Sequence, residues 1–325
     1  MAFTALTCPQ CGAGLPRQAS WRMVSCPYCA ALVSRCKSLV LAAALHEAAA
    51  RVRAQAVADY APGLRVLRWH EQRYQLLKRV GNGEHSEVYL AERMGPLPER
   101  VIVKLAHTST KHGVLAAEAE ILRSLQASRV GVAACFSPPV PQLIANGVSE
   151  AAAGEEREVM VLRHPSGYWG SLAHVLRGAP TGIDPRHGVW IWRRMLEVLA
   201  FAHDSGWTHG ELTPEHWLVH PRDHGVHLVG WSHAAPGADA AAIARDLRQS
   251  AWAVRALLSG GDALPACGGS TPSSLVDLLR RSSEDATWCA EVGARGLDQA
   301  LIAAAHTAFG PPRFIPFNPT AAAYR

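Results

Sequence analysis

Hydrophobic side chains recur at helical spacing in several segments of the chain. In residues 186–205, large apolar side chains return every three or four positions, which predicts a core helix with its tryptophans packed inside the protein. The apolar positions are Trp190, Met195, Leu196, Leu199 and Phe201. Residues 275–279 and 297–309 carry shorter clusters of the same kind, so we expect further helices near the C-terminus.

A looser helical pattern follows Ser38, which can cap the first turn. Its apolar residues are Leu41, Leu45, Val52 and Val57, with many alanines between them. The Pro62-Gly63 pair ends the pattern, because neither residue readily continues a helix. We therefore expect residues 38–63 to form a helical linker between two folded modules.

Composition indicates a folded protein with no membrane partner. The chain has 325 residues, 49% hydrophobic and 18% charged, which fits one large two-lobed domain plus a small module. The net charge of +5 is spread along the chain, so nucleic acid is not the first partner to expect. The N-terminus lacks the features of a signal peptide, and the apolar run 39–45 is too short to cross a membrane. We expect a cytoplasmic protein, and the abundance of Ala, Arg and Trp is typical of a GC-rich bacterial genome.

Four of the eight cysteines form two Cys-x-x-Cys pairs, Cys8 with Cys11 and Cys26 with Cys29. Two such turns can present four thiolates to one tetrahedral Zn²⁺, because soft sulfur ligands suit this ion. We expect residues 1–37 to be a four-cysteine zinc ribbon with a structural metal, since four protein ligands leave no open position. Metal binding would supply most of the folding free energy of so small a segment.

Other interpretations of this segment remain open. The cysteines could form disulfides or a redox pair, although the remaining four cysteines are not spaced as in a disulfide framework. Resemblance to zinc ribbons implies a docking module and, less often, a nucleic-acid reader. The flanking basic residues could serve a reader or simply offset the charge of the thiolates. They are Arg17, Arg22, Arg35 and Lys37.

A second family resemblance covers most of the chain. Residues 80–90, Val-Gly-Asn-Gly-Glu-His-Ser-Glu-Val-Tyr-Leu, have small residues at the spacing of a phosphate-binding loop. Lys104 ends a Val-Ile-Val-Lys segment, Glu118 follows in an Ala- and Leu-containing stretch, and residues 159–162 are again apolar. From residue 74 to about 310, this order of motifs resembles the protein kinase superfamily.

The resemblance implies an α+β fold of two lobes with ATP between them. Residues 64–165 would form a β-sheet with one helix and the hinge, and residues 166–310 a mainly helical lobe. Residues 311–325 would be a tail that packs on its own lobe or, less favoured, docks a partner. Glu120 is the alternative to Glu118 as the ion-pair partner of Lys104. The implied nucleotide-binding residues are Gly81, Gly83, Val88, Lys104 and Glu118.

The kinase chemistry is largely replaced. Residues 207–219, Trp-Thr-His-Gly-Glu-Leu-Thr-Pro-Glu-His-Trp-Leu-Val, align without gaps with the His-Arg-Asp-Leu-Lys-Pro-Glu-Asn catalytic loop. Glu211 stands at the position of the catalytic aspartate, Thr213 at the phosphate-contacting lysine, and His216 at the metal-binding asparagine. The extra methylene of Glu211 would shift its carboxylate by about 1 Å, which costs about a hundredfold in a positioned reaction.

Gly230 stands where kinases carry the aspartate that holds Mg²⁺ against the phosphates. Glycine offers no ligand, so the resemblance implies a doubtful Mg²⁺ dependence, unless Asp223 or Asp239 supplies a carboxylate. The segment from Ser232 to Asp246 is too short for a kinase activation loop and peptide platform. We expect Asp246 to be the first residue of a helix and to anchor the catalytic loop.

Histidines crowd the same region, and a second metal site is conceivable. Pro214 and Pro221 prevent a regular helical ladder of imidazoles, and residues 221–225 are typical of a turn, so we favour no dedicated site. His216 could still be a poor metal ligand. The histidines are His203, His209, His216, His220, His224, His227 and His233, of which His209 is expected to be structural.

The sequence favours a pseudokinase, a signalling scaffold or allosteric regulator that binds protein partners and can bind ATP without efficient phosphoryl transfer. One alternative is an atypical active serine/threonine-type kinase with Glu211 as base and His216 or Glu215 as metal ligand. Another is a small-molecule phosphotransferase, since these enzymes carry a related His-Gly-Asp loop. The last is a zinc-ribbon regulator that binds nucleic acid.

Overall fold

The computed structural model divides the chain into two compact units, residues 1–65 and 66–325. The structure describes residues 24–25, 32–33, 65–95, 98–107, 113–128, 140–150, 156–165, 167–221, 225–261, 270–313, 315 and 317. In the first unit, the strands β1 (Val24–Ser25) and β2 (Leu32–Val33) pair in antiparallel fashion. The four paired cysteines and the expected linker helix lie outside the described residues.

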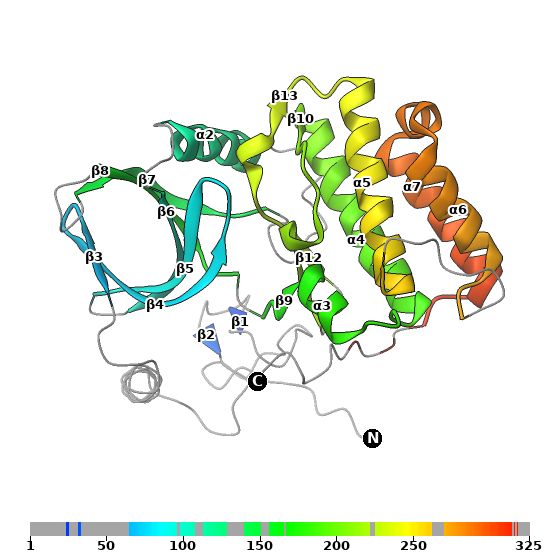
Figure 1. Ribbon diagram of the computed structural model, residues 1–325, viewed down its shortest axis with the longest axis horizontal. Helices are drawn as coiled ribbons and strands as arrows, with labels where there is room; N and C mark the ends of the chain where they lie inside the picture. Colours follow the sequence, from blue (N-terminus) through cyan, green and yellow to red (C-terminus); the bar gives the residue numbers. More distant parts are fainter. Residues whose placement is uncertain are drawn as a thin grey trace. The chain divides into compact units, whose positions relative to one another are not determined.

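The second unit begins with an antiparallel six-stranded sheet that curls on itself (Figure 1), and its strand order is β3-β4-β5-β6-β8-β7. The strands are β3 (Val66–Trp69), β4 (Gln72–Asn82), β5 (Ser86–Arg93), β6 (Glu99–Ala106), β7 (Leu143–Glu150) and β8 (Glu156–Arg163). Helix α2 (Val114–Ala127) packs against β7 and β8. The described residues of this part therefore form one sheet and one helix.

Strand β6 shows why the sheet has two different faces. Val101, Val103 and Leu105 are buried in a cluster with residues of the neighbouring strands. Successive side chains of a strand point to opposite faces, so Ile102 and Lys104 lie on the other side. Ile102 packs against the second, larger core of the unit, and Lys104 reaches helix α2.

The rest of the unit is mainly helical, and Figure 1 shows its long helices side by side. The helices are α3 (Leu172–Gly178), α4 (Pro185–Asp204), α5 (Ala240–Ser259), α6 (Ser273–Glu284) and α7 (Ala286–Phe309). Short strands and single turns connect them: β9 (Gly170–Ser171), β10 (Trp207–Thr208), η2 (Pro214–His216), β11 (Trp217–His220), β12 (Gly225–Leu228), η3 (Trp231–His233) and β13 (Ala235–Pro236). The described unit is thus α+β, a sheet followed by a mainly helical region.

Helix α4 is the core helix that the apolar spacing predicts. Asp184 caps it by accepting a hydrogen bond from the backbone N–H of Arg186, and Pro185 occupies the first turn, where no donor is lost. Trp192 and Met195 are completely buried on its inner face. The two C-terminal helices also form, as α6 and α7.

One predicted helix boundary is wrong. Helix α5 begins at Ala240, so Asp246 lies inside the helix and is not its first residue. The start is set by Asp239, whose carboxylate accepts a hydrogen bond from the backbone N–H of Ala242 at 2.8 Å. Asp239 is therefore an N-cap residue, and the first turns of α5 precede Asp246.

Part of the C-terminal tail packs on the helical region. Phe317 is 5% exposed and its ring lies 4.9 Å from the imidazole of His187 on α4, so this residue packs on the helical region. Among the described residues, no helix is long and apolar enough to cross a membrane.

Candidate functional site

The segment after β10 is held in place by the carboxylate of Asp246. This side chain is fully buried and accepts hydrogen bonds from the backbone N–H groups of His209 and Gly210, at 2.9 and 3.0 Å. The ring of His203 lies 3.1 Å from the same carboxylate. Burial would raise the pKa of Asp246, but the hydrogen bonds from His203 and the two amides outweigh it and lower the pKa.

His209 is a second internal support of the segment. Its Nε2 donates to the backbone carbonyl of Val229 at 3.0 Å, and its ring lies 4.9 Å from that of Trp231. Burial, helped by the neighbouring His216, lowers the pKa of His209 to about 4. The imidazole is thus neutral at physiological pH, which agrees with the expected structural role. Further along, Leu212 donates its backbone N–H to the side chain of Gln249, a contact that the sequence analysis missed.

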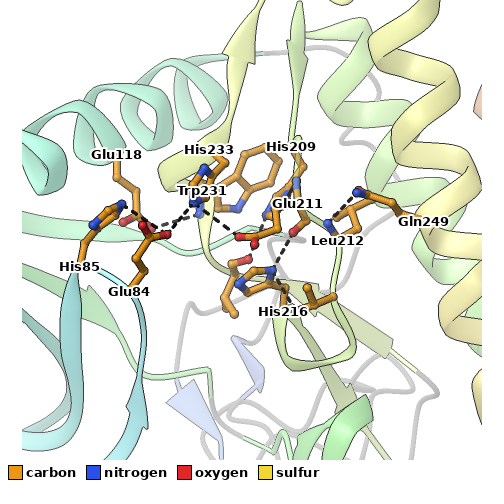
Figure 2. Close-up of polar contacts among 12 residues, drawn as sticks. Glu84, His85, Glu118, His209, Glu211, Leu212, His216, Trp231, His233 and Gln249 are labelled. Atoms are coloured by element: carbon orange, nitrogen blue, oxygen red, sulfur yellow. Dashed lines mark hydrogen bonds and ion pairs between the residues drawn. The ribbon is translucent and has the colours of Figure 1, made fainter.

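Lys104 and Glu118 form an ion pair between β6 and α2. Both side chains are largely buried, with exposed fractions of 13% and 2%. The second oxygen of Glu118 accepts a hydrogen bond from the backbone N–H of Trp231 at 3.2 Å, visible in Figure 2. The sheet, helix α2 and turn η3 therefore meet at Glu118. The alternative partner, Glu120, is exposed and pairs with Arg123.

The turn between β4 and β5 carries the glycines of the predicted phosphate-binding loop. Gly81 pairs with Val88 across these strands, and Val88 pairs with Lys104 across β5 and β6. Gly83 donates its backbone N–H to the carbonyl of Ser86 at 2.9 Å, which closes the turn. Gly81, Val88 and Lys104 thus lie in one row across three strands, whereas Gly83 lies in the turn and Glu118 on α2.

Gly230 and His216, which the sequence analysis aligned with the metal-binding positions of kinases, face each other in the structure. Gly230 has φ +81°, and a Cβ built there would lie only 2.5 Å from Cδ2 and 2.6 Å from Nε2 of His216. The imidazole therefore fills the space that a side chain at position 230 would need. Its Nδ1 donates to the backbone carbonyl of Glu211 at 2.7 Å, so the ring is held there by a hydrogen bond.

The remaining carboxylates do not restore a magnesium site in the described residues. Asp239 caps α5, and Asp223 lies outside the described residues. Glu211 is half exposed, and its carboxylate lies 3.5 Å from Nε2 of His233. The residues present at the two metal positions, an imidazole and a glycine, do not fit Mg²⁺, which prefers several oxygen ligands.

The other histidines have separate partners. The rings of His220 and His227 lie 5.4 Å from that of Tyr168, and His224 is outside the described residues. His233 instead faces Glu84 and His85 in the turn between β4 and β5. No sequence signal linked these residues, because the turn and η3 are far apart along the chain.

A scan of protein-family models finds none that matches this chain.

Proposed function

We propose that the protein is a pseudokinase, which binds a nucleotide without efficient phosphoryl transfer and acts on protein partners as a signalling scaffold or allosteric regulator. The observation that carries this proposal is the contact of His216 with Gly230. The imidazole stands where a metal-holding carboxylate would project, and the left-handed backbone of Gly230 disfavours any side chain.

Phosphoryl transfer requires more than a base. Metal ions neutralise the charge that develops on the transferred phosphoryl group, and this electrostatic term supplies most of the rate acceleration. Glu211 could accept a proton, but Asp239 caps α5, and the two aligned metal positions hold an imidazole and a glycine, which are not ligands that Mg²⁺ prefers. These features support loss of catalysis rather than a rebuilt metal centre.

Other features support retention of a nucleotide site. Lys104 is held in position by a buried partner, and Gly81 near the end of β4 lies in the same row of paired residues, next to the turn that contains Gly83. Lys104 can therefore meet a phosphate as a fixed positive charge without a metal. A nucleotide bound there would contact the β4–β5 turn, Lys104 and, through Glu118, turn η3. Its binding could then change the relative stability of two arrangements of these elements, which is the basis of an allosteric signal.

The test is the thermal unfolding midpoint of the full chain with ATP, in the presence and absence of Mg²⁺. We expect ATP to raise the midpoint without requiring Mg²⁺, because binding to the folded state alone stabilises it. The variant Gly81→Asp should abolish the shift by placing a negative charge beside the phosphates. A Cβ at Gly81 makes only ordinary contacts, the nearest at 3.5 Å, so the variant should fold.

Gly95→Asp is the matched control, because a Cβ there meets no atom within 4 Å and the residue lies outside the predicted loop. This variant should keep the ATP shift. A shift that requires Mg²⁺, with phosphate transfer lost in Glu211→Gln, would replace the pseudokinase proposal with an active kinase. No shift in any condition would remove nucleotide from the proposal.

A further inference from the structure

Four side chains that could bind a metal meet at the opening between the β4–β5 turn and the segment 207–233. Glu84 and His85 lie in the turn, Glu211 follows β10, and His233 ends η3. Figure 2 shows Glu84 between the two imidazoles, with Glu211 on the other side of His233. We call these four residues the His-Glu cluster.

The spacing of Glu84, His85 and His233 fits one metal ion bound by one atom of each, and Glu211 lies beside His233. Nε2 of His233 lies 3.6 Å from Oε2 of Glu84 and 3.5 Å from Oε2 of Glu211, and Nε2 of His85 lies 3.8 Å from Oε2 of Glu84. One ligand atom each from Glu84, His85 and His233 lie within 4.8 Å of one another. Zinc bonds of about 2.0–2.2 Å at tetrahedral angles separate ligand atoms by about 3.3–3.6 Å.

The carboxylates of the cluster have no stronger competitor among the described ion pairs. Glu84 forms ion pairs with His85 and His233, and Glu211 with His233, and neither forms one with a lysine or arginine. Most other carboxylate ion pairs of the described residues are made with arginine or lysine, such as Arg93 with Glu99. The cluster thus joins two negative charges to two imidazoles, a combination that a divalent cation would neutralise.

We propose that the His-Glu cluster binds a divalent transition-metal ion of the zinc type. Imidazole nitrogen with carboxylate oxygen suits Zn²⁺, whereas Mg²⁺ prefers oxygen ligands alone. Glu84, His85 and His233 supply three ligands, and Glu211 supplies the fourth. The exposed fractions of these side chains, from 29% for His85 to 70% for Glu84, leave the ion a path from solvent.

The ion would have a mechanical and a chemical consequence. It would tie the β4–β5 turn to the segment after β10 and to η3. It would also occupy Glu211, the one remaining candidate base. The proposal does not depend on nucleotide binding, and its test contains no nucleotide, so either proposal can fail alone.

The test compares zinc binding by the full chain and by His233→Ala, measured by competition with a chromophoric chelator and by metal analysis after gel filtration. We expect wild type to bind one more Zn²⁺ at micromolar free zinc than His233→Ala, and Glu84→Gln to weaken this site at least about tenfold. His306→Ala is the matched control, since His306 is exposed on α7 and outside the cluster. It should bind as wild type.

Cobalt substitution separates the cluster from the cysteine pairs. Co²⁺ in the cluster should give visible bands without a sulfur charge-transfer absorption, and these bands should disappear in His233→Ala. They should persist when Cys8, Cys11, Cys26 and Cys29 are all replaced by serine. Equal zinc stoichiometry and affinity in wild type, His233→Ala and Glu84→Gln would overturn the proposal.

Discussion

Two sets of residues around the segment 207–216 differ in burial and in bonding. The supporting set, Asp246, His209, His203 and Gln249, lies inside the protein or donates and accepts hydrogen bonds that fix the backbone of the segment. The reactive positions, Glu211, Thr213, His216 and Gly230, lie at least partly exposed and bond mainly to one another or to His233.

This difference separates residues that fix the backbone of the segment from residues that lie at its surface. The supporting residues contribute to the free energy of folding, so their loss would damage the protein whether or not it is a catalyst. The side chains of Glu211, Thr213 and His216 do not fix buried backbone groups, so we expect their replacement to cost less free energy of unfolding. Gly230 is the exception, because of its positive φ and its contact with His216. We therefore expect substitutions in the two sets to have very different effects on stability.

Asp246→Ala should give the largest effect. It removes the acceptor of two backbone N–H groups in a fully buried position and leaves them unpaired. We expect a loss of about 3–5 kcal/mol in the free energy of unfolding, measured by urea denaturation. Asp239→Ala, the matched control at the exposed N-cap of the same helix, should cost about 1 kcal/mol. Similar losses in the two variants would contradict the comparison.

The same carboxylate gives a pH dependence. The folded protein holds the pKa of Asp246 below its usual value of 3.8, so its stabilising contribution is present above about pH 4 and declines as the pH falls below it. The stability difference between wild type and Asp246→Asn should therefore shrink under acid. A constant difference from pH 7 to pH 3 would contradict this assignment.

Lys104→Met should have the next largest effect, because it leaves the carboxylate of Glu118 buried without its charge partner. Breaking a buried ion pair costs about 3–5 kcal/mol, and the partial exposure of Lys104 reduces our expectation to about 2–3 kcal/mol. Arg280→Met, which breaks an exposed pair with Asp277, should change stability by less than about 0.5 kcal/mol. A Lys104→Met/Glu118→Gln double variant should recover part of the loss. Equal effects of the two single variants would show that the Lys104 pair is not buried.

Parts of this organisation could be predicted from the sequence because they depend on local pattern. Apolar spacing located α4, and the resemblance to kinases placed Lys104 in a strand, which is β6. The predicted start of α5 is wrong because it rests on the alignment of Asp246 with the first residue of a kinase helix. The observed start is set by Asp239, which caps the helix.

The contacts that decide the site could not be predicted. Whether an imidazole at position 216 fills the space beside Gly230 depends on the folding of two segments against each other, which no local pattern encodes. The His-Glu cluster likewise joins Glu84 to His233, residues whose proximity follows from the closure of the β4–β5 turn onto η3. The cysteine pairs lie outside the described residues, so the zinc ribbon stays a prediction.

Gly230→Ala tests the fit between the two altered metal positions. The substitution adds the strain of a side chain at positive φ and a contact with the imidazole of His216. We expect a loss of about 2 kcal/mol, measured by urea denaturation. Gly206→Ala has the same φ of +81° but open space around its Cβ, so it should cost only about 1 kcal/mol.

A double-mutant cycle isolates the contact. In the His216→Ala background the cost of Gly230→Ala should fall to that of Gly206→Ala, since only the backbone strain remains. An unchanged cost in that background would mean that the imidazole does not occupy the space beside Gly230.

The smallest effect should come from restoring the metal positions. The double variant His216→Asn/Gly230→Asp replaces the imidazole with an amide oxygen and adds a carboxylate, which are ligands that Mg²⁺ accepts. Removal of the ring also makes room for the new side chain, and aspartate tolerates a positive φ better than most residues. We expect Mg²⁺ to add about 1 kcal/mol to the stabilisation by ATP, which corresponds to about 2–4 °C in the unfolding midpoint.

Neither single variant should gain this dependence, because each restores only one ligand and Gly230→Asp alone meets the imidazole. If the double variant remains indifferent to Mg²⁺ while it still binds ATP, the lost metal site must involve more of the segment than these two positions. Thr213 and Glu211 would then be the next residues to replace, by the lysine and the aspartate of the kinase motif, because Mg²⁺ binding would depend on more than positions 216 and 230.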